Sequence, residues 1–118
     1  MSKIILDTNS LIYAVKKHID LSNALFGIDE INGIIVPECV ASELRGLSIR
    51  NPHARAALEL ISRFEIINSE GRGDDCILET ARRLGAFILT NDRGLLTRAK
   101  SLGIRNASIR SNGTVRMN

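Results

Sequence analysis

Three short, continuous apolar runs constrain the fold of this chain more than any other feature. They are Ile4-Ile5-Leu6, Ile34-Ile35-Val36 and Phe87-Ile88-Leu89. Because polar residues do not alternate with the apolar ones, each run is typical of a strand buried on both faces, as in a parallel sheet that helices cover on both sides. We predict strands over these runs, the first spanning residues 3–6, and a further strand over residues 64–67.

Amphipathic segments with helical spacing separate the apolar runs. They predict helices over residues 10–17 and 20–26, and a third that begins near Pro37. A fourth helix is expected after the break at Asn51-Pro52, a fifth from a cap at Asp74 or Asp75, and a sixth after the strand at 87–89. The inner faces of three of these helices are expected to extend to their last turns, at Leu47, Leu84 and Leu102.

Turn and cap residues mark the ends of these elements. Gly85 and Gly103 are expected to end two helices in the left-handed conformation. Asn112-Gly113, between alternating side chains, predicts a hairpin near the C-terminus. The alternation of strands and helices favours an α/β fold: a three-layer α/β/α sandwich with a mostly parallel central sheet and a short C-terminal hairpin, in one domain spanning residues 1–118.

Composition and cysteine content indicate the cellular compartment in which the protein is expected. The apolar runs are too short for a membrane-spanning helix, and no secretory signal is visible, so we expect a cytoplasmic protein without membrane contact. The two cysteines, Cys39 and Cys76, form neither a CxxC pair nor a zinc-binding spacing. We expect them to be small buried thiols, because disulfides are rare in cytoplasmic chains.

Four acidic residues, Asp7, Glu43, Asp74 and Asp92, are candidate catalytic and metal-binding residues. Three of them sit at predicted strand–helix junctions, and Glu43 lies on the helix that begins near Pro37. The carboxyl ends of parallel strands meet at one crevice, where ligands usually bind. Gathered carboxylates cannot all stay ionised without a cation, and hard oxygen ligands select Mg²⁺ or Mn²⁺. The pattern therefore indicates a metal-dependent hydrolase, with phosphodiester cleavage as the leading chemistry.

Polar neighbours of these acids are candidates for supporting roles, in holding the carboxylates or a metal-bound water. They are Thr8, Asn9, Asp75, Thr90 and Asn91.

Each acid also has a purely structural explanation. Asp7 and Asp92 are placed to cap the helices that follow them, and Glu43 flanks an apolar stripe as an ordinary surface residue does.

The distribution of charge points to a polyanionic partner. The net charge is +3, and Asp92 is the last acidic residue of the chain. Arg93, Arg98 and Lys100 follow it and are candidates for RNA binding through flanking phosphates. The alternative is a solvated basic surface that aids solubility.

Four segments together resemble the PIN-domain nucleases: LDTNSLI at 6–12, VPECVASELRGL at 36–47, GDDCILETARRLGAFILTNDRGL at 73–95, and the tail that ends the sheet. The resemblance implies a parallel sheet in the order 3-2-1-4-5 and an acidic cluster around Mg²⁺ or Mn²⁺. Asp7, Glu43 and Asp92 match the first, the helix-borne and the last acid of the family. The third acid usually stands sixteen residues before the threonine of the T-N-D step, which favours Asp74 over Asp75.

Two branches of the family compete. The compact segment at 18–47 is similar to archaeal PIN proteins related to the small-subunit processome nucleases, which implies ribosomal RNA processing with ribosome-assembly factors as partners. VapC-type toxins, which pair with an antitoxin, carry the same acids, and PIN domains often form homodimers. A binding module with vestigial activity also stays open. A HAD-type phosphatase is disfavoured, because DTN at 7–9 lacks the second aspartate of a DxD pattern.

Overall fold

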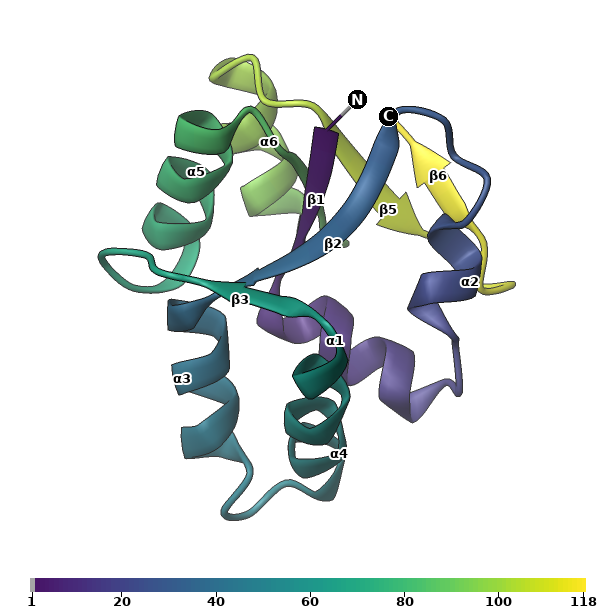
Figure 1. Cartoon of the computed structure of the whole chain (residues 1–118), viewed down its shortest axis with the longest axis vertical. Helices are drawn as coiled ribbons and strands as arrows, with labels where there is room; N and C mark the ends of the chain where they lie inside the picture. The colour runs from purple at the N-terminus through teal and green to yellow at the C-terminus, as the bar shows by residue number, and fades with distance from the viewer. Residues whose placement is uncertain (1) are drawn as a thin grey trace.

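The computed structural model describes residues 2–118, and it is an α/β structure built on a six-stranded sheet in the order β3-β2-β1-β4-β5-β6 (Figure 1). The strands are β1 (Ser2–Leu6), β2 (Ile31–Pro37), β3 (Glu65–Ile67), β4 (Phe87–Leu89), β5 (Asn106–Ile109) and β6 (Val115–Met117). The helices are α1 (Thr8–Lys16), α2 (Leu21–Leu25), α3 (Glu38–Leu47), α4 (Pro52–Leu60), α5 (Gly73–Leu84) and α6 (Arg93–Ser101), with a 3₁₀ turn at Ile61–Arg63. The predicted fold class and strand order are confirmed, and β6 adds the predicted antiparallel hairpin strand.

The connections between the parallel strands divide the helices into two groups. From β1 the chain moves outward through β2 to β3, then crosses back to β4 on the other side of β1 and continues to β5. Because such crossovers are right-handed, the reversal of direction places α1–α4 on one face and α5 and α6 on the other. In agreement, α3 and α4 contact each other and α1, whereas α5 and α6 contact β4 and β5, respectively (Figure 1). The strand order therefore reverses between β1 and β4, the position where α/β folds bind ligands.

The apolar runs form the centre of the sheet. Ile4, Ile5 and Leu6 of β1 are completely buried, as are Ile88 and Leu89 of β4. β1 lies between β2 and β4 and is parallel to both. This double coverage is the reason that the runs lack polar alternation. The register pairs Leu6 with Leu89, so the residues that follow each strand, Asp7 and Thr90, leave the sheet side by side.

The helix ends follow the predicted chemistry with one exception. The side chains of Asp7, Asp20, Asn51 and Asp92 each accept a hydrogen bond from a backbone N–H of the helix that follows. Gly85 and Gly103 have φ values of 63° and 72°, which confirms the left-handed helix ends. The prediction that Asp74 or Asp75 caps α5 is wrong. The helix starts at Gly73, its cap residue is Arg72, and both aspartates already lie inside the first turn.

Three leucines that we expected inside the helix faces are largely exposed. Leu47, Leu84 and Leu102 have exposed fractions of 41%, 46% and 55%. Leu47 and Leu84 are the last residues of α3 and α5, and Leu102 directly follows α6. The buried faces end about one turn earlier, at Leu44, Ala81 and Ala99.

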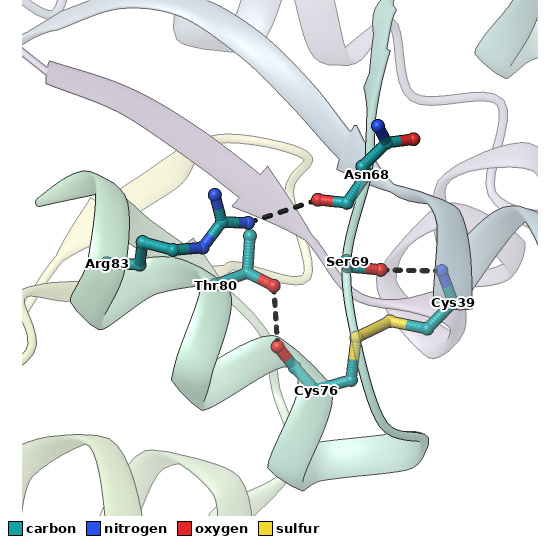
Figure 2. The surroundings of a disulfide bond; sticks show 6 residues. All are labelled: Cys39, Asn68, Ser69, Cys76, Thr80 and Arg83. Atoms are coloured by element: carbon teal, nitrogen blue, oxygen red, sulfur yellow. Dashed lines mark hydrogen bonds between the residues drawn. A yellow bond between two sulfur atoms is a disulfide. The ribbon is translucent and has the colours of Figure 1, made fainter.

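The expectation that the cysteines are free thiols is also wrong: Cys39 of α3 and Cys76 of α5 form a disulfide (Figure 2). They are 37 residues apart in sequence, but the fold brings their Cα atoms to 6.7 Å, within the range that a disulfide spans. Closing a loop of that length stabilises the folded state by about 4 kcal/mol in the chain-entropy description. Within residues 2–118, no helix has the length and apolar character needed to cross a membrane.

Candidate functional site

Three of the four predicted acids line one small cleft at the carboxyl edge of the sheet. Asp7 follows β1, Glu43 projects from α3, and Asp74 comes from the first turn of α5. The cleft has a volume of about 50 Å³. Its other lining residues are Thr8, Asn9, Cys39, Val40, Gly73 and Ile77. Asp92 lines the neighbouring hollow with Asn9, Ser10, Tyr13, Asn91 and Ile109. Asn9 lines both, so the two hollows are adjacent. Folding therefore brings residues 7, 43, 74 and 92 to one edge of the sheet.

Asp7 is the buried anchor of this cluster. Only 5% of its surface is exposed. Its Oδ1 accepts a hydrogen bond from the Ser10 N–H at 2.8 Å, and its Oδ2 accepts one from the Thr90 hydroxyl at 2.5 Å. Burial raises the pKa of Asp7, the hydrogen bonds from Ser10 and Thr90 lower it, and the negative charge of Asp74 raises it further. Burial has the largest effect, so the pKa of Asp7 lies above its ordinary value despite the two hydrogen bonds.

Asp74 lies at the electrostatic centre of the cluster. Its pKa is raised, first by partial loss of hydration and then by the charge of Asp92, with smaller contributions from Asp75 and Glu43; only Arg98 opposes them. Mutual repulsion of this kind acts over a few ångströms. Electrostatic coupling thus extends from Asp74 to all three of the other predicted acids, including the exposed Glu43.

Thr90 joins the ends of the two central strands. Its side chain is completely buried. The hydroxyl donates to Asp7, and the same oxygen accepts the backbone N–H of Asp92 at 3.1 Å. The Asp92 Oδ1 in turn accepts the Leu95 N–H at 2.9 Å, so Asp92 caps α6 while it faces the cluster. The structural and the functional explanations of Asp92 are therefore compatible, because a capped carboxylate keeps unused lone pairs.

The remaining supporting candidates separate into two groups. Thr8 and Asn9 lie on the wall of the cleft, where we expected them. Asn91 lines the hollow beside Asp92, and its amide also joins β4 to β5: its Nδ2 donates to the Ile109 carbonyl at 2.9 Å and its Oδ1 accepts the Ile109 N–H at 2.7 Å. These two bonds fix the amide, which keeps a second N–H and a second lone pair.

Asp75 and Arg98 pair with each other. The Arg98 Nη2 lies 2.6 Å from the Asp75 Oδ1, in an exposed ion pair between α6 and α5. Asp75 therefore points away from the cleft that Asp74 lines, and Arg98, predicted to bind RNA, is partly neutralised. Arg93 and Lys100, on the same helix, are exposed and are in no ion pair within residues 2–118.

Sequence reasoning missed two contributors to the site. Ser10 fixes Asp7 through its N–H and bonds its hydroxyl to the Leu89 carbonyl at 3.2 Å, which ties α1 to β4. The first of these bonds follows from the predicted cap at Asp7, because it uses only the backbone N–H three residues later. The second contributor is Cys39, which lines the cleft while bonded to Cys76. No local signal indicates it.

The donor set suits a hard divalent cation. Every candidate ligand in the cleft is a carboxylate, and the sulfur of Cys39 is blocked by its disulfide. The pKa values of Asp7 and Asp74 are raised first by burial and then by neighbouring carboxylates, and a bound cation would offset the repulsion between these carboxylates. Within residues 2–118, no three acidic, histidine or cysteine side chains are close enough to form a closed site. Glu43 and Asp74 are exposed and can turn toward an ion, whereas Asp7 is fixed.

Comparison with known proteins identifies the family. The family model described as "PIN like domain" matches residues 4–112. The chain belongs to this PIN-like domain family. It is 34% identical over 107 residues to Ribonuclease VapC9 of Archaeoglobus fulgidus, with 85% of this chain and 77% of that protein covered.

Solved structures agree with the family assignment. The PIN domain endonuclease Utp24 superposes with a TM-score of 0.83 at 28% identity, covering 98% of this chain and 90% of that one. VapBC2 of Rickettsia felis, solved bound to a DNA fragment from its promoter, shares the fold with a TM-score of 0.66 at 23% identity, over 89% of this chain and 97% of that one.

Proposed function

We propose that this PIN-like domain is a Mg²⁺- or Mn²⁺-dependent endoribonuclease whose metal ligands are Asp7, Glu43, Asp74 and Asp92. The observation that carries the proposal is the convergence of these four carboxylates, from four separate parts of the chain, on the edge where the strand order reverses. The similarity to a protein named a ribonuclease, which extends over most of the chain, supports RNA as the substrate.

Each residue of the cluster has a distinct task in this proposal. Asp7 is held rigid by Ser10 and Thr90 and gives the site a fixed oxygen. Asp92 is held by its cap and by Thr90. Glu43 and Asp74, on exposed helix positions, close around the ion from the two helix layers. A divalent ion bound there polarises the phosphodiester and lowers the pKa of an attacking water, and the expected products are a 3′-hydroxyl and a 5′-phosphate.

RNA is expected to approach along α6. Arg93, Arg98 and Lys100 extend along that helix, which Asp92 caps. Phosphates on either side of the scissile bond would contact these cations, with Arg98 exchanging its partner Asp75 for a phosphate oxygen.

The direct test compares acidic variants with a matched surface variant. Asp7→Asn and Asp92→Asn are expected to abolish Mn²⁺-dependent cleavage of a labelled RNA while the far-UV circular dichroism stays unchanged. Glu79→Gln is the control, because Glu79 is an exposed acid on α5 that pairs with Arg82 away from the cleft. Full activity in both aspartate variants would refute the metal site. RNA binding that persists in EDTA, without turnover in either ion, would instead favour a binding module.

Two biological roles fit this chemistry, and each has an observation in its favour. The resemblance of the segment at 18–47 to the small-subunit processome nucleases favours ribosomal RNA processing, with ribosome-assembly factors as partners, and the similarity to the endonuclease Utp24 is compatible with it. The sequence similarity to Ribonuclease VapC9 favours a toxin ribonuclease paired with an antitoxin.

RNA crosslinking in cells with the inactive Asp92→Asn variant separates the two roles. Reads concentrated on ribosomal RNA precursors support processing. Reads on transfer or messenger RNA, with growth arrest on expression of the active protein, support the toxin. A homodimer, which sedimentation would reveal, is compatible with either role.

A further inference from the structure

We propose that the Cys39–Cys76 disulfide is a positioning crosslink for the acidic cluster, and that its reduction by a dithiol weakens divalent-cation binding. The crosslink holds together the two helices that carry Glu43 and Asp74, so that both side chains can turn toward one ion. This inference rests on the proposed function in one respect, namely that the cluster binds a divalent cation.

Each cysteine lies on a helix that also carries an acidic residue of the cluster. Cys39 precedes Glu43 by one helical turn on α3, so the two side chains share a face of the helix. Cys76 follows Asp74 by two residues in the first half of α5. Cys39 also lines the same cleft as Asp7, Glu43 and Asp74. The disulfide is therefore part of the wall of the proposed metal site.

The two crosslinked helices belong to different layers of the fold. The chain places α3 and α5 on opposite faces of the sheet, and they meet only at its carboxyl edge, beyond β2 and β3. The loop between β3 and α5 adds a weaker link, because the Cys39 N–H donates to the Ser69 Oγ at 3.1 Å (Figure 2). Like charges on Glu43 and Asp74 oppose close approach of the helices. The covalent bond counters that repulsion.

Reduction must alter this edge of the molecule. Two unbonded sulfur atoms cannot remain as close as two bonded ones. Cys76 is completely buried, so its side chain has little free space into which to turn. The adjustment therefore falls on Cys39 and on the position of α3, which carries it, relative to α5. Divalent ions such as Mg²⁺ tolerate little error in ligand geometry, and loss of the groups that orient ligands typically weakens affinity about 10- to 100-fold.

The disulfide can be reached from outside the cleft. Cys39 is half-buried and lines a second hollow of about 390 Å³, with Ser42, Gly71 and Arg72 among its other residues. A thiolate of the dithiol attacks the Cys39 sulfur, which forms a mixed disulfide and releases Cys76 as a thiolate that takes up a proton. The second thiol of the reductant then displaces Cys39. The two cysteines gain two electrons and two protons, and the reductant leaves as its own disulfide.

Calorimetric titration with Mn²⁺ alone tests the proposal without any substrate. The samples are the oxidised protein, the protein reduced with dithiothreitol and then desalted under inert gas, and the Cys39→Ser/Cys76→Ser variant. Mass spectrometry verifies the state of the cysteines, and circular dichroism verifies the fold at the temperature used. We expect the oxidised protein to bind Mn²⁺ about 10- to 100-fold more tightly than both others. If the double variant does not fold, the reduced wild-type protein supplies the comparison.

Two controls distinguish positioning from general stabilisation. Reduction is expected to weaken Mn²⁺ binding much less in Glu43→Gln, because this variant has already lost a ligand that the crosslink positions. In Asp92→Asn, reduction is expected to weaken binding by the same factor as in the wild type, because Asp92 lies before α6, which the crosslink does not hold. Ile61→Ala, which opens a cavity at a buried position away from the cleft, is expected to lower the melting temperature and keep the affinity.

Equal Mn²⁺ affinity with and without the crosslink would overturn the inference and leave the proposed function intact. So would failure of the two cysteines to pair under oxidising conditions. Absence of Mn²⁺ binding in the oxidised protein would instead contradict the proposed function, and the inference with it.

Discussion

Replacing Thr90 by valine isolates the bond that joins the two central strands at the acidic cluster. Valine has nearly the same shape, so packing is kept, but the Asp7 carboxylate loses a donor and the Asp92 N–H loses an acceptor. A hydrogen bond to a charged group contributes about 1.5–3 kcal/mol and a neutral one about 0.5–1.5 kcal/mol. We therefore expect Thr90→Val to lower the free energy of unfolding by about 2–4 kcal/mol at pH 7. For a chain of 118 residues this lowers the melting temperature by about 8–16 °C.

The penalty should depend on pH in a direction that the structure fixes. The pKa of Asp7 in the folded protein already lies above its ordinary value of 3.8, and loss of the Thr90 bond raises it further. Below pH 3.8 the carboxyl is protonated in the folded and unfolded states, so its charge contributes nothing to the difference between wild type and variant. As pH rises through the folded-state pKa values, the variant loses more stability than the wild type, because ionising Asp7 now costs more. The difference between the two proteins therefore grows from pH 3 to pH 7.

Urea unfolding of the metal-free protein, followed by circular dichroism at pH 3 and pH 7, measures the effect. Thr90→Ser is the matched control: it keeps the hydroxyl and deletes one buried methyl group, for a cost of about 1 kcal/mol that does not change with pH. A Thr90→Val penalty that is flat with pH, or no larger than that of Thr90→Ser, would refute the assigned network.

Three further predictions concern helix geometry, metal binding and the basic helix. Open space surrounds Gly85 and Gly46, so an added methyl group meets no other atom at either position. Gly85→Ala should destabilise the protein by about 1–2 kcal/mol, because φ is 63° there, whereas Gly46→Ala within α3 should stabilise it by about 0.5–1 kcal/mol. Thermal unfolding of the two variants checks that the effects have opposite signs. As the pH is lowered, the Mn²⁺ affinity measured by calorimetry should begin to fall while the pH is still above 3.8. The reason is that the pKa values of Asp7 and Asp74 are both raised, and the ion must displace their protons. An affinity that starts to fall only below pH 3.8 contradicts this. Arg98→Gln should leave the melting temperature unchanged, because the ion pair of Arg98 with Asp75 is exposed. The same variant should reduce the salt dependence of RNA binding in filter-binding assays. An unaltered salt dependence would show that Arg98 does not contact RNA.

Interactions between distant segments explain where sequence reasoning failed. The pairing of Cys39 with Cys76 depends on how α3 and α5 converge beyond the sheet, and nothing in the segment between the two cysteines, which are 37 positions apart, encodes that convergence locally. The bonds that fix the Asn91 amide to the backbone of β5 were likewise not indicated by the sequence, because Ile109 is 18 residues away. The choice between Asp74 and Asp75 likewise depends on which way α5 faces, and the position of Arg98 on α6 accounts for the orientation of Asp75.

The sequence by itself determined the parallel sheet and the edge where the acids gather, because both follow from local patterns: apolar runs without alternation, and polar residues at the ends of those runs. Helix caps at Asp7, Asn51 and Asp92 are equally local, since each is completed within three residues of the cap. Only the tertiary structure decided the Thr90 bridge, the Asp75–Arg98 pair and the disulfide. These depend on strand register, on the packing of α5 beside α6 and on the meeting of α3 and α5 from opposite layers. Such contacts arise from packing of the whole chain and leave no periodicity in its sequence.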